Sequence, residues 1–373
     1  MNKTIRIAQI MGKWVGGGVE NVVMNYYSNI DHSKIQFDFI CDEDSTNIPY
    51  EKIKNMGGNI ILVPPYQNVF KYQKKLIQIF KKNKYNIVHS HINALSFFSL
   101  RAAKKASVPI RIAHSHSTTN KREWKKNLLK NLLRPFSKVY ATHYMCCSEI
   151  AGRWLFGNKT YDKGEVILIN NAIDIYKFAY DEKKRYSKRL ELNIKEDTLV
   201  IGHVGRFVKQ KNHDFLIEVF KYIHNENKNS ILLLIGQGPL KDEIKEKVKK
   251  IGLSENVKFL GQREDVDELY QAMDLFLFPS LYEGLGMVII EAQVSGLSCV
   301  CSTEVPNVVK INKNIEFVSL NDSLEEWNKK ILDVLKTEKR MNYFKSIDNS
   351  GYNIKIEAKK LQDTYMKWNE IYE

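Results

Sequence analysis

The chain has 373 residues, of which 43% are hydrophobic and 27% charged, enough for two packed domains of ordinary size. No stretch approaches the roughly 18 consecutive apolar residues of a membrane-spanning helix. Fifty-seven basic against 43 acidic residues give a formal net charge of +14, which attracts anionic partners of any kind. Because the basic residues do not interleave with a base-stacking aromatic motif, we expect no nucleic-acid partner.

The N-terminus leads directly into a short apolar run, without the longer apolar core and small-residue cleavage site of a signal peptide. We therefore expect a cytoplasmic protein, either soluble or held at the inner face of the plasma membrane. None of the five cysteines has metal-ligand partners at a workable spacing. We expect reduced structural thiols and no metal site.

The first half of the chain alternates β-branched runs with amphipathic stretches, a pattern that predicts parallel βαβ units with right-handed crossovers. The expected strands are Ile5–Ile10, Phe37–Ile40, Asn59–Val63, Ile87–His89, Ile110–Ala113 and Val166–Ile169. The expected helices include Val19–Ser28, Val69–Lys82 and Leu95–Ala106.

A charged stretch, Tyr176–Glu196, interrupts this alternation and has the composition of a linker with a short helix. A second series of strands follows, at Leu199–Val204, Ile231–Ile235, Val257–Leu260, Leu275–Phe278 and Cys299–Cys301. The expected helices of the second half are Asp214–His224, Leu240–Lys250, Val266–Met273, Met287–Ser295, Ser323–Leu335 and an amphipathic C-terminal helix, Ile354–Ile371.

The pattern thus predicts two Rossmann-like α/β domains. We place the first in residues 1–175, completed by a C-terminal helix in 354–373, and the second in residues 176–353. Parallel sheets bind ligands beyond the carboxyl ends of their strands, so two such domains facing each other would enclose a cleft between them.

Each half opens with a strand and a glycine-containing turn, Gly12–Gly18 in the first half and Gly202–Arg206 in the second. Glycine lets the backbone approach a phosphate and leaves helix-terminal amides free to bind it. Neither turn has the G-x-G-x-x-G spacing of a dinucleotide site, which argues against a nicotinamide or flavin enzyme. A tight strand-to-helix turn would also use glycine without any ligand.

Charged side chains follow two strands of the second half. Arg206 and Lys211 lie on the loop after its first strand and could together neutralise a diphosphate, or could form a solvated basic loop. Glu283 and Glu291 are eight positions apart, about two helical turns, so both could line one cleft. Glu291 lies in an apolar helix and would be costly if unpaired. It needs a ligand such as ribose hydroxyls, or a local backbone amide.

These features together resemble glycosyltransferase family 4. Glu283 and Glu291 match its E-x7-E signature, Gly205-Arg206 with Lys211-Asn212 its diphosphate loop, and Gly236-Gln237-Gly238 its G-x-G turn. Further matches are Gly17-Gly18-Val19-Glu20, Asn171-Ala172-Ile173-Asp174 and, in the capsular and exopolysaccharide branch, His114-Ser115-His116 and the segment 319–327. The order and spacing agree from about residue 5 to 300, with a departure around Val305–Asn314.

The resemblance implies a GT-B fold, in which two Rossmann-like domains face an interdomain cleft, with the acceptor bound by the N-terminal domain and the nucleotide sugar by the C-terminal one. It assigns the diphosphate to Arg206 and Lys211, the ribose to Glu291 and the donor-sugar hydroxyls to Glu283. It gives His116 a hydrogen bond to the transferred sugar. Arg263 would lie where the family binds the base of the nucleotide. The remaining donor-binding positions are Gly17, Gly18, Gly205, Gly236, Gly238, Leu285, Gly286 and Met287.

The resemblance also implies retention of configuration without a cofactor or metal, using a nucleotide diphosphate sugar, expected to be a UDP-hexose, and a glycan or lipid-linked acceptor of cell-surface polysaccharide synthesis. A metal-dependent GT-A enzyme would need an Asp-x-Asp motif. Two such motifs are present, and we interpret neither as a metal site. We expect Asp42-Glu43-Asp44 to be an exposed loop and Asp265-Val266-Asp267 to be a helix start with Asp265 as N-cap. An inactive glycosyltransferase-like partner subunit is the nonenzymatic alternative.

Membrane attachment is suggested by the segment Lys121–Arg134, in which Trp124, Leu128 and Leu132 recur every four residues among basic side chains, with Leu129 and Leu133 widening the stripe. A second basic run lies at Lys71–Lys84. The alternative is that the leucines pack on the sheet and the lysines are a solvated face. We expect an anionic membrane surface as a partner.

Overall fold

The computed structural model describes residues 4–117, 131–336, 340, 342, 344–348 and 350–372. The chain separates into two compact units, Met1–Ile173 with Gly351–Glu373, and Asp174–Ser350. Each unit is built on one parallel sheet with helices on both faces, as the strand and helix alternation predicts. Within the described ranges, no helix combines the length and the apolar character needed to cross a bilayer.

The first unit has a seven-stranded sheet of order β3-β2-β1-β4-β5-β6-β7. Its strands are β1 (Ile5–Gly12), β2 (Ile35–Asp42), β3 (Asn59–Val63), β4 (Ile87–Ser90), β5 (Ile110–Ser115), β6 (His143–Cys146) and β7 (Val166–Leu168). Its helices are α1 (Gly18–Tyr27), α2 (Tyr50–Asn55), α3 (Val69–Asn83), α4 (Ser96–Lys105), α6 (Glu149–Phe156), α7 (Asn158–Asp162) and α16 (Ile354–Glu370).

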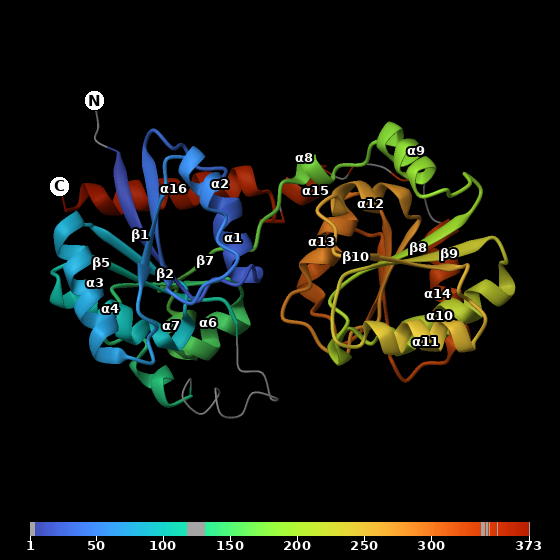
Figure 1. The fold of residues 1–373 in the computed structure, drawn as a ribbon, viewed down its shortest axis with the longest axis horizontal. Helices are drawn as coiled ribbons and strands as arrows, with labels where there is room; N and C mark the ends of the chain where they lie inside the picture. Colours follow the sequence, from blue (N-terminus) through green and yellow to red (C-terminus); the bar gives the residue numbers. More distant parts are fainter. Residues whose placement is uncertain are drawn as a thin grey trace. The chain divides into compact units, whose positions relative to one another are not determined.

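Both faces of this sheet are buried, because neighbouring residues of a strand point to opposite sides. On β1, Ile7 joins the core under α1 and α16, whereas Ala8 joins the core under α3 and α4. Figure 1 shows α16, in red, running across the first unit although it comes last in the chain. Tyr365 of α16 packs edge-on against Phe37 of β2, with ring centroids 6.2 Å apart.

The second unit has a six-stranded sheet of order β10-β9-β8-β11-β12-β13. Its strands are β8 (Leu199–Val204), β9 (Ser230–Ile235), β10 (Val257–Gly261), β11 (Leu275–Phe278), β12 (Ser298–Ser302) and β13 (Ile315–Val318). Its helices are α8 (Ile175–Phe178), α9 (Glu182–Glu191), α10 (His213–Glu226), α11 (Lys241–Lys250), α12 (Val266–Ala272), α13 (Met287–Val294), α14 (Leu324–Lys336) and α15 (Phe344–Asp348).

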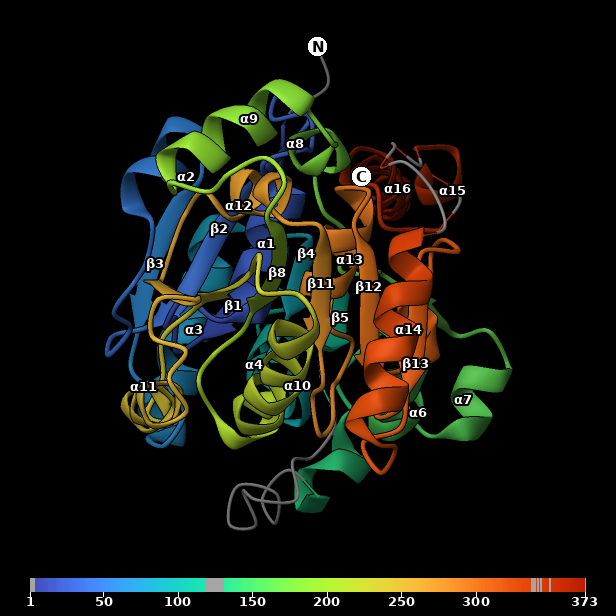
Figure 2. The ribbon, with the colours of Figure 1, turned by 90° about the vertical axis from the view of Figure 1, so that its right-hand side faces the viewer.

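Figure 2 shows α10 and α14 side by side in front of this sheet. Their apolar faces fill the core against the strands, and the buried Trp327 of α14 meets Phe215 of α10 edge-on. On the opposite face, Tyr270 of α12 packs against Phe276 of β11. The aliphatic strands are therefore covered on both sides, as parallel sheets require.

The sequence missed two strands, β6 and β13, and the short helices α2, α6, α7 and α15. The short helix expected within Tyr176–Glu196 is present as α9, but the expectation of a linker is wrong, since α9 packs on α12 of the second unit. Lys188 and Arg189 are only 5% and 4% exposed, and Arg189 donates to Asp274 at 2.7 Å. Two of the basic residues of this stretch, Lys188 and Arg189, are thus buried in ion pairs with the second unit. The five cysteines are free and buried, as expected.

Candidate active site

Each sheet reverses its strand order once, between β1 and β4 in the first unit and between β8 and β11 in the second. At such a switch point the flanking loops diverge and leave a crevice at the carboxyl edge, which is where open α/β sheets bind ligands. The loop after β8 carries Arg206 and Lys211, and the loop after β11 carries Glu283. Arg206, Lys211 and Glu283 therefore lie on the two loops that flank this switch point.

Lys211 and Glu283 form a close ion pair across this switch point. The Nζ of Lys211 lies 2.7 Å from Oε1 of Glu283, and the two side chains are 16% and 7% exposed. The same ammonium lies 4.5 Å from the ring centre of Phe278, the last residue of β11. A carboxylate and an ammonium are thus held together at the end of two central strands.

The loops that carry this pair are joined by Gln210. Its carbonyl accepts a hydrogen bond from Leu281 N at 2.8 Å, and its side-chain amide donates to the carbonyl of Tyr282 at 2.9 Å. These two bonds fix the loop after β11 directly beside the loop after β8. Gln210 was not among the residues selected from the sequence, because nothing in its local context marks it.

The Gly236-Gln237-Gly238 turn supports the loop after β8 by direct backbone contact. A Cβ on Gly236, whose φ is +141°, would lie 2.1 Å from the carbonyl oxygen of Gly205. A Cβ on Gly238 would lie 2.5 Å from the carbonyl oxygen of Phe207. Only glycine fits at these two positions, which explains the G-x-G pattern by packing under the loop.

Arg206 is exposed, and in the described part of the chain its guanidinium has no hydrogen-bond or salt-bridge partner. Lys211 lies over the neighbouring glycine, since a Cβ on Gly205 would come within 3.3 Å of the Lys211 side chain. One cation is therefore paired and largely shielded from solvent, while the other is free. A free guanidinium beside a glycine loop suits a bidentate phosphate contact.

Helix α13 begins at this edge with backbone donors available. Its N-cap is Gly286, with φ at +87° and no side-chain cap. Among the described residues, the N–H groups of Leu285, Gly286 and Met287 have no hydrogen-bond acceptor. Unsatisfied amides at a helix N-terminus favour an anion.

Glu291 of α13 has a partner that the sequence did not predict. The hydroxyl of Tyr270, on α12, lies 3.1 Å from its Oε2. Burial raises the pKa of the Glu291 carboxyl to about 7, against the opposing effect of this hydrogen bond and of the Lys177 charge. The carboxyl group is therefore held by a tyrosine, and neither a bound ligand nor a backbone amide is needed to explain its position.

Arg263 follows β10 and makes a bidentate contact with Asp265, at 2.7 Å from Nε and 2.6 Å from Nη2. Glu191 is a further partner at 3.2 Å. The expectation that Asp265 caps α12 is wrong for its side chain: the residue occupies the N-cap position, but its carboxylate binds Arg263 and Lys188. The guanidinium of Arg263 is thus already neutralised.

In the first unit, Gly17 is the N-cap of α1 and Gly18 its first residue. A Cβ on Gly17 would lie 3.0 Å from the Glu20 carboxylate, whereas Gly18 faces open space. Glu20 accepts a hydrogen bond from Val15 N at 3.1 Å and closes the turn. At the carboxyl end of β1, the backbone of this glycine turn is therefore not covered by other side chains at Gly18.

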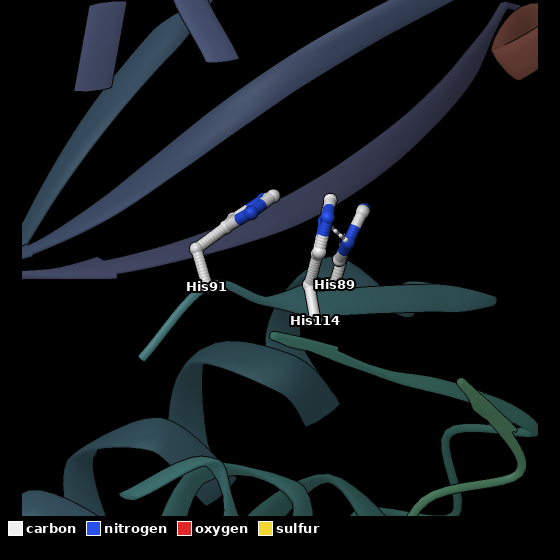
Figure 3. A group of neighbouring side chains, drawn as sticks. All are labelled: His89, His91 and His114. Carbon is white, nitrogen blue, oxygen red and sulfur yellow. Dashed lines mark hydrogen bonds between the residues drawn. The ribbon is translucent and has the colours of Figure 1, made fainter. Parts of the chain in front are cut away.

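His116 lies just beyond β5 and belongs to a cluster of four histidines with His89, His91 and His114. Figure 3 shows the last three side chains, which come from β4, the residue after it and β5. Burial lowers the pKa of His116 to about 3 and lowers those of the other three well below their ordinary values. All four rings are neutral near pH 7.

The structure bears on two further expectations in part. Asp42-Glu43-Asp44 is not simply an exposed loop, because Asp42 ends β2 and is 3% exposed, while Asp44 pairs with Lys13 at 2.7 Å. Burial raises the pKa of Asp42 to about 6. Most of the segment Lys121–Arg134 lies outside the described residues, and Leu133, at its end, is buried in the core under α3 and α4.

The fold and the switch-point site define a glycosyltransferase of the GT-B type, and comparison with known proteins agrees. Residues 16–177 match the family model Glycosyltransferase Family 4, and residues 184–349 match the model Glycosyl transferases group 1. EpsF of Bacillus subtilis, which is named as a glycosyltransferase, is 34% identical over 328 residues, covering 86% of this chain and 85% of that relative. The chain belongs to glycosyltransferase family 4.

Two other similar proteins have more specific names. The UDP-Gal:alpha-D-GlcNAc-diphosphoundecaprenol alpha-1,3-galactosyltransferase of Escherichia coli is 25% identical over 383 residues, covering 97% of both chains. The crystal structure of Anabaena HepE in complex with UDP is similar in fold, with a TM-score of 0.74 and 17% identity over 98% of this chain and all of that one. The predicted GT-B fold is confirmed.

Proposed function

We propose that this enzyme transfers a hexose from a UDP-sugar to a glycan or lipid-linked acceptor during cell-surface polysaccharide synthesis, with retention of configuration. The observation that carries the proposal is the switch point of the second unit. There the Lys211–Glu283 pair joins the loop that carries the free Arg206 to the loop that ends in the open amides of α13. The names of similar proteins support the substrate classes. HepE was crystallised with UDP, and the name of the Escherichia coli galactosyltransferase gives UDP-Gal as donor and a diphosphoundecaprenol-linked sugar as acceptor.

Each predicted residue has a role in this proposal. Arg206 and Lys211 hold the diphosphate, and the N–H groups of Leu285, Gly286 and Met287 supplement them. Glu291 accepts hydrogen bonds from ribose hydroxyls, Glu283 from hydroxyls of the donor sugar, and the loop at Arg263 receives the base. His116 contacts the transferred sugar, and the turn at Gly17 and Gly18 leaves room for the donor.

The proposed reaction is a front-face displacement. The bond between the anomeric carbon and the diphosphate oxygen breaks, and the acceptor oxygen bonds to that carbon on the same face. The departing phosphate oxygen takes the acceptor proton. The protein contributes position and countercharge, with Arg206 and Lys211 stabilising the negative charge that develops on the leaving group.

The test is incubation of the full chain with UDP-, GDP- and ADP-hexoses and a lipid-linked acceptor, measuring nucleotide diphosphate release and product anomer. We expect UDP release with retained configuration, undiminished by a strong chelator. Full loss of turnover in chelator that manganese restores would contradict the metal-free mechanism. Nucleotide binding without release from any sugar would favour the inactive partner subunit.

We further propose that the first unit attaches to anionic membrane through α3. Its exposed side includes Phe70, which is 90% exposed, and six lysines. The lysines are Lys71, Lys74, Lys75, Lys81, Lys82 and, at the C-cap, Lys84. None of them pairs with an acidic side chain in the part of the chain that the structure describes. An exposed aromatic ring among unpaired cations suits the headgroup region of an anionic bilayer, and a lipid-linked acceptor would be reached there.

A further inference from the structure

The four histidines of the first unit come from alternate positions on neighbouring parallel strands, so their rings gather on one face. His89, His91 and His114 are 1%, 5% and 2% exposed, and only His116 is partly accessible. The cavity beside them has a volume of about 20 Å³, room for about one water molecule and far too little for a sugar. Of the four, His116 alone is placed to meet a substrate.

His116 is the end of a hydrogen-bonded chain that begins on β1. The Oε1 of Gln9 lies 2.7 Å from Nε2 of His91, and Nδ1 of His91 lies 2.9 Å from Nε2 of His116. Gln9 is fully buried, as the middle of a central strand should be. The backbone of His116 is fixed as well, because its N–H donates to Oδ1 of Asn93 at 2.8 Å.

The direction of this chain follows from its first member. The amide oxygen of Gln9 can only accept, so Nε2 of His91 must carry a proton. Because the His91 ring is neutral, its Nδ1 is bare and accepts from Nε2–H of His116. The neutral His116 ring then has a bare Nδ1, which has no partner among the residues that the structure describes.

We propose that Gln9 and His91 are positioning residues that hold His116 as the Nε2–H tautomer and present its Nδ1 as a hydrogen-bond acceptor for a hydroxyl of the substrate. This inference rests on the proposed function for the identity of that substrate, a sugar. It gives His116 a defined chemistry: the group it recognises must donate a proton, so a hydroxyl is bound and an ether oxygen at the same place is not.

The other titratable groups around His116 do not compete for its Nδ1. His89 and His114 form a second chain, in which the Tyr365 hydroxyl lies 2.6 Å from Nδ1 of His89 and Nε2 of His89 lies 3.0 Å from Nδ1 of His114. The Tyr365 hydroxyl also interacts with the side chain of Gln9, so the two chains meet at their buried ends. Tyr26 donates to the carbonyl of Asn170, and the Cys147 thiol donates to the carbonyl of His116.

A metal centre is the other chemistry that three such rings suggest, since His89, His91 and His114 each offer a nitrogen within 4.8 Å of the others. Tetrahedral zinc needs nitrogens about 3.3 Å apart whose lone pairs converge on one point. Here the nitrogens of His89 and His114 face each other as donor and acceptor (Figure 3), and both nitrogens of His91 are engaged. The geometry therefore favours two hydrogen-bonded chains, in which each ring nitrogen has a defined protonation, over a metal site.

The test is ¹⁵N–¹H correlation NMR of the histidine rings in the full-length protein, which reports the tautomer without any sugar donor. We expect His91 and His116 to be protonated on Nε2. Gln9→Met, similar in size but without an acceptor, should give mixed tautomers at both rings. Tyr26→Phe, which removes a buried hydroxyl that bonds the carbonyl of Asn170 and no histidine, should leave His116 unchanged.

In transfer assays, Gln9→Met should lower kcat/KM about tenfold, equivalent to about 1.4 kcal/mol, whereas Tyr26→Phe should not. A wild-type His116 protonated on Nδ1, or stoichiometric zinc bound to the histidines of the purified protein, would overturn the inference whether or not the variants fold. Because the NMR measurement needs no turnover, failure of the proposed transfer reaction would be recognised separately, in the nucleotide-release assay.

Discussion

The ammonium of Lys211 and the carboxylate of Glu283 are 2.7 Å apart although 72 residues separate them in the chain. Both side chains are largely buried, so neither charge is fully hydrated and each depends on the other. The pair also ties the two loops of the switch point together. It therefore combines a structural role in the free protein with the proposed role in donor binding.

Removing one partner should expose this dependence. Lys211→Met would leave the Glu283 carboxylate buried without a countercharge, and we expect a loss of about 3 kcal/mol in the free energy of unfolding. Chemical denaturation of the variant measures it. The double variant Lys211→Met/Glu283→Gln should regain most of that stability and remain inactive. Equal stability of the single variant and the wild type would show that the pair is not buried as described.

Arg206 should behave in the opposite way. It is exposed and without a partner in the described chain, so Arg206→Ala should change stability by less than about 0.5 kcal/mol. Loss of its countercharge on the leaving diphosphate should lower kcat roughly 100-fold, and Arg206→Ala with Lys211→Ala should nearly abolish transfer. Nucleotide release and thermal unfolding, measured on the same preparations, separate the two effects. Transfer by the double variant at the wild-type rate would refute the site.

The positions of Arg206, Lys211 and Glu283 could be predicted from the sequence because each follows an apolar run that had to be a central strand. Their pairing could not, since it depends on how Gln210 joins the two loops. Likewise, the apolar surroundings of Glu291 predicted a buried carboxylate needing a partner, but Tyr270 lies on another helix and no local pattern connects them.

The histidines show the same limit. His114 and His116 are visible as a motif, whereas Gln9 and His91 come from other strands and acquire their roles only through the sheet order β1-β4-β5. Strands β6 and β13 escaped prediction because polar side chains interrupt their short apolar runs, His143 and Tyr144 in β6 and Glu316 in β13. Short periodic runs carry little signal.

The G-x-G turn offers a purely steric prediction. Gly236→Ala places a Cβ 2.1 Å from the Gly205 oxygen and imposes a φ of +141° on a non-glycine residue. We expect the diphosphate loop to shift, with loss of stability and of UDP affinity, measured by thermal unfolding and calorimetry. Gly252→Ala is the matched control, since Gly252 also has a positive φ, +76°, but its Cβ meets nothing within 4 Å. Comparable losses in both variants would mean that packing under the loop is not the cause.

Glu291 predicts a pH dependence. Burial raises the pKa of its carboxyl from 4.5 to about 7. Between these values the folded protein holds a proton that the unfolded chain releases, so this residue makes the fold less stable as the pH rises through that window. Glu291→Gln should remove this contribution, seen as a shallower decline of unfolding free energy between pH 5 and about 7.

The same titration should affect nucleotide binding with the opposite sign. The ionised carboxylate is the better acceptor for ribose hydroxyls, so UDP affinity should rise from about pH 6 to about pH 8 in the wild type. Glu291→Gln should bind UDP about tenfold more weakly and without that rise. Calorimetric titration at three pH values checks it. A variant that bound UDP as tightly as the wild type at high pH would remove Glu291 from the ribose site.

Membrane attachment is predicted to depend on the exposed side of α3. Changing Lys71, Lys74 and Lys75 to Gln should weaken binding to anionic liposomes by about 3 kcal/mol, at about 1 kcal/mol for each cation near the surface. Lys221, Lys249 and Lys250, three exposed lysines of the second unit, provide a control with the same change in net charge. Flotation with anionic and neutral liposomes at low and high salt measures the effect, because attachment by charge must weaken as salt screens it.

Equal losses in both triple variants would mean that overall charge, and not α3, governs attachment. Equal recovery of the wild type in all four conditions, or recovery in none, would rule out electrostatic attachment altogether.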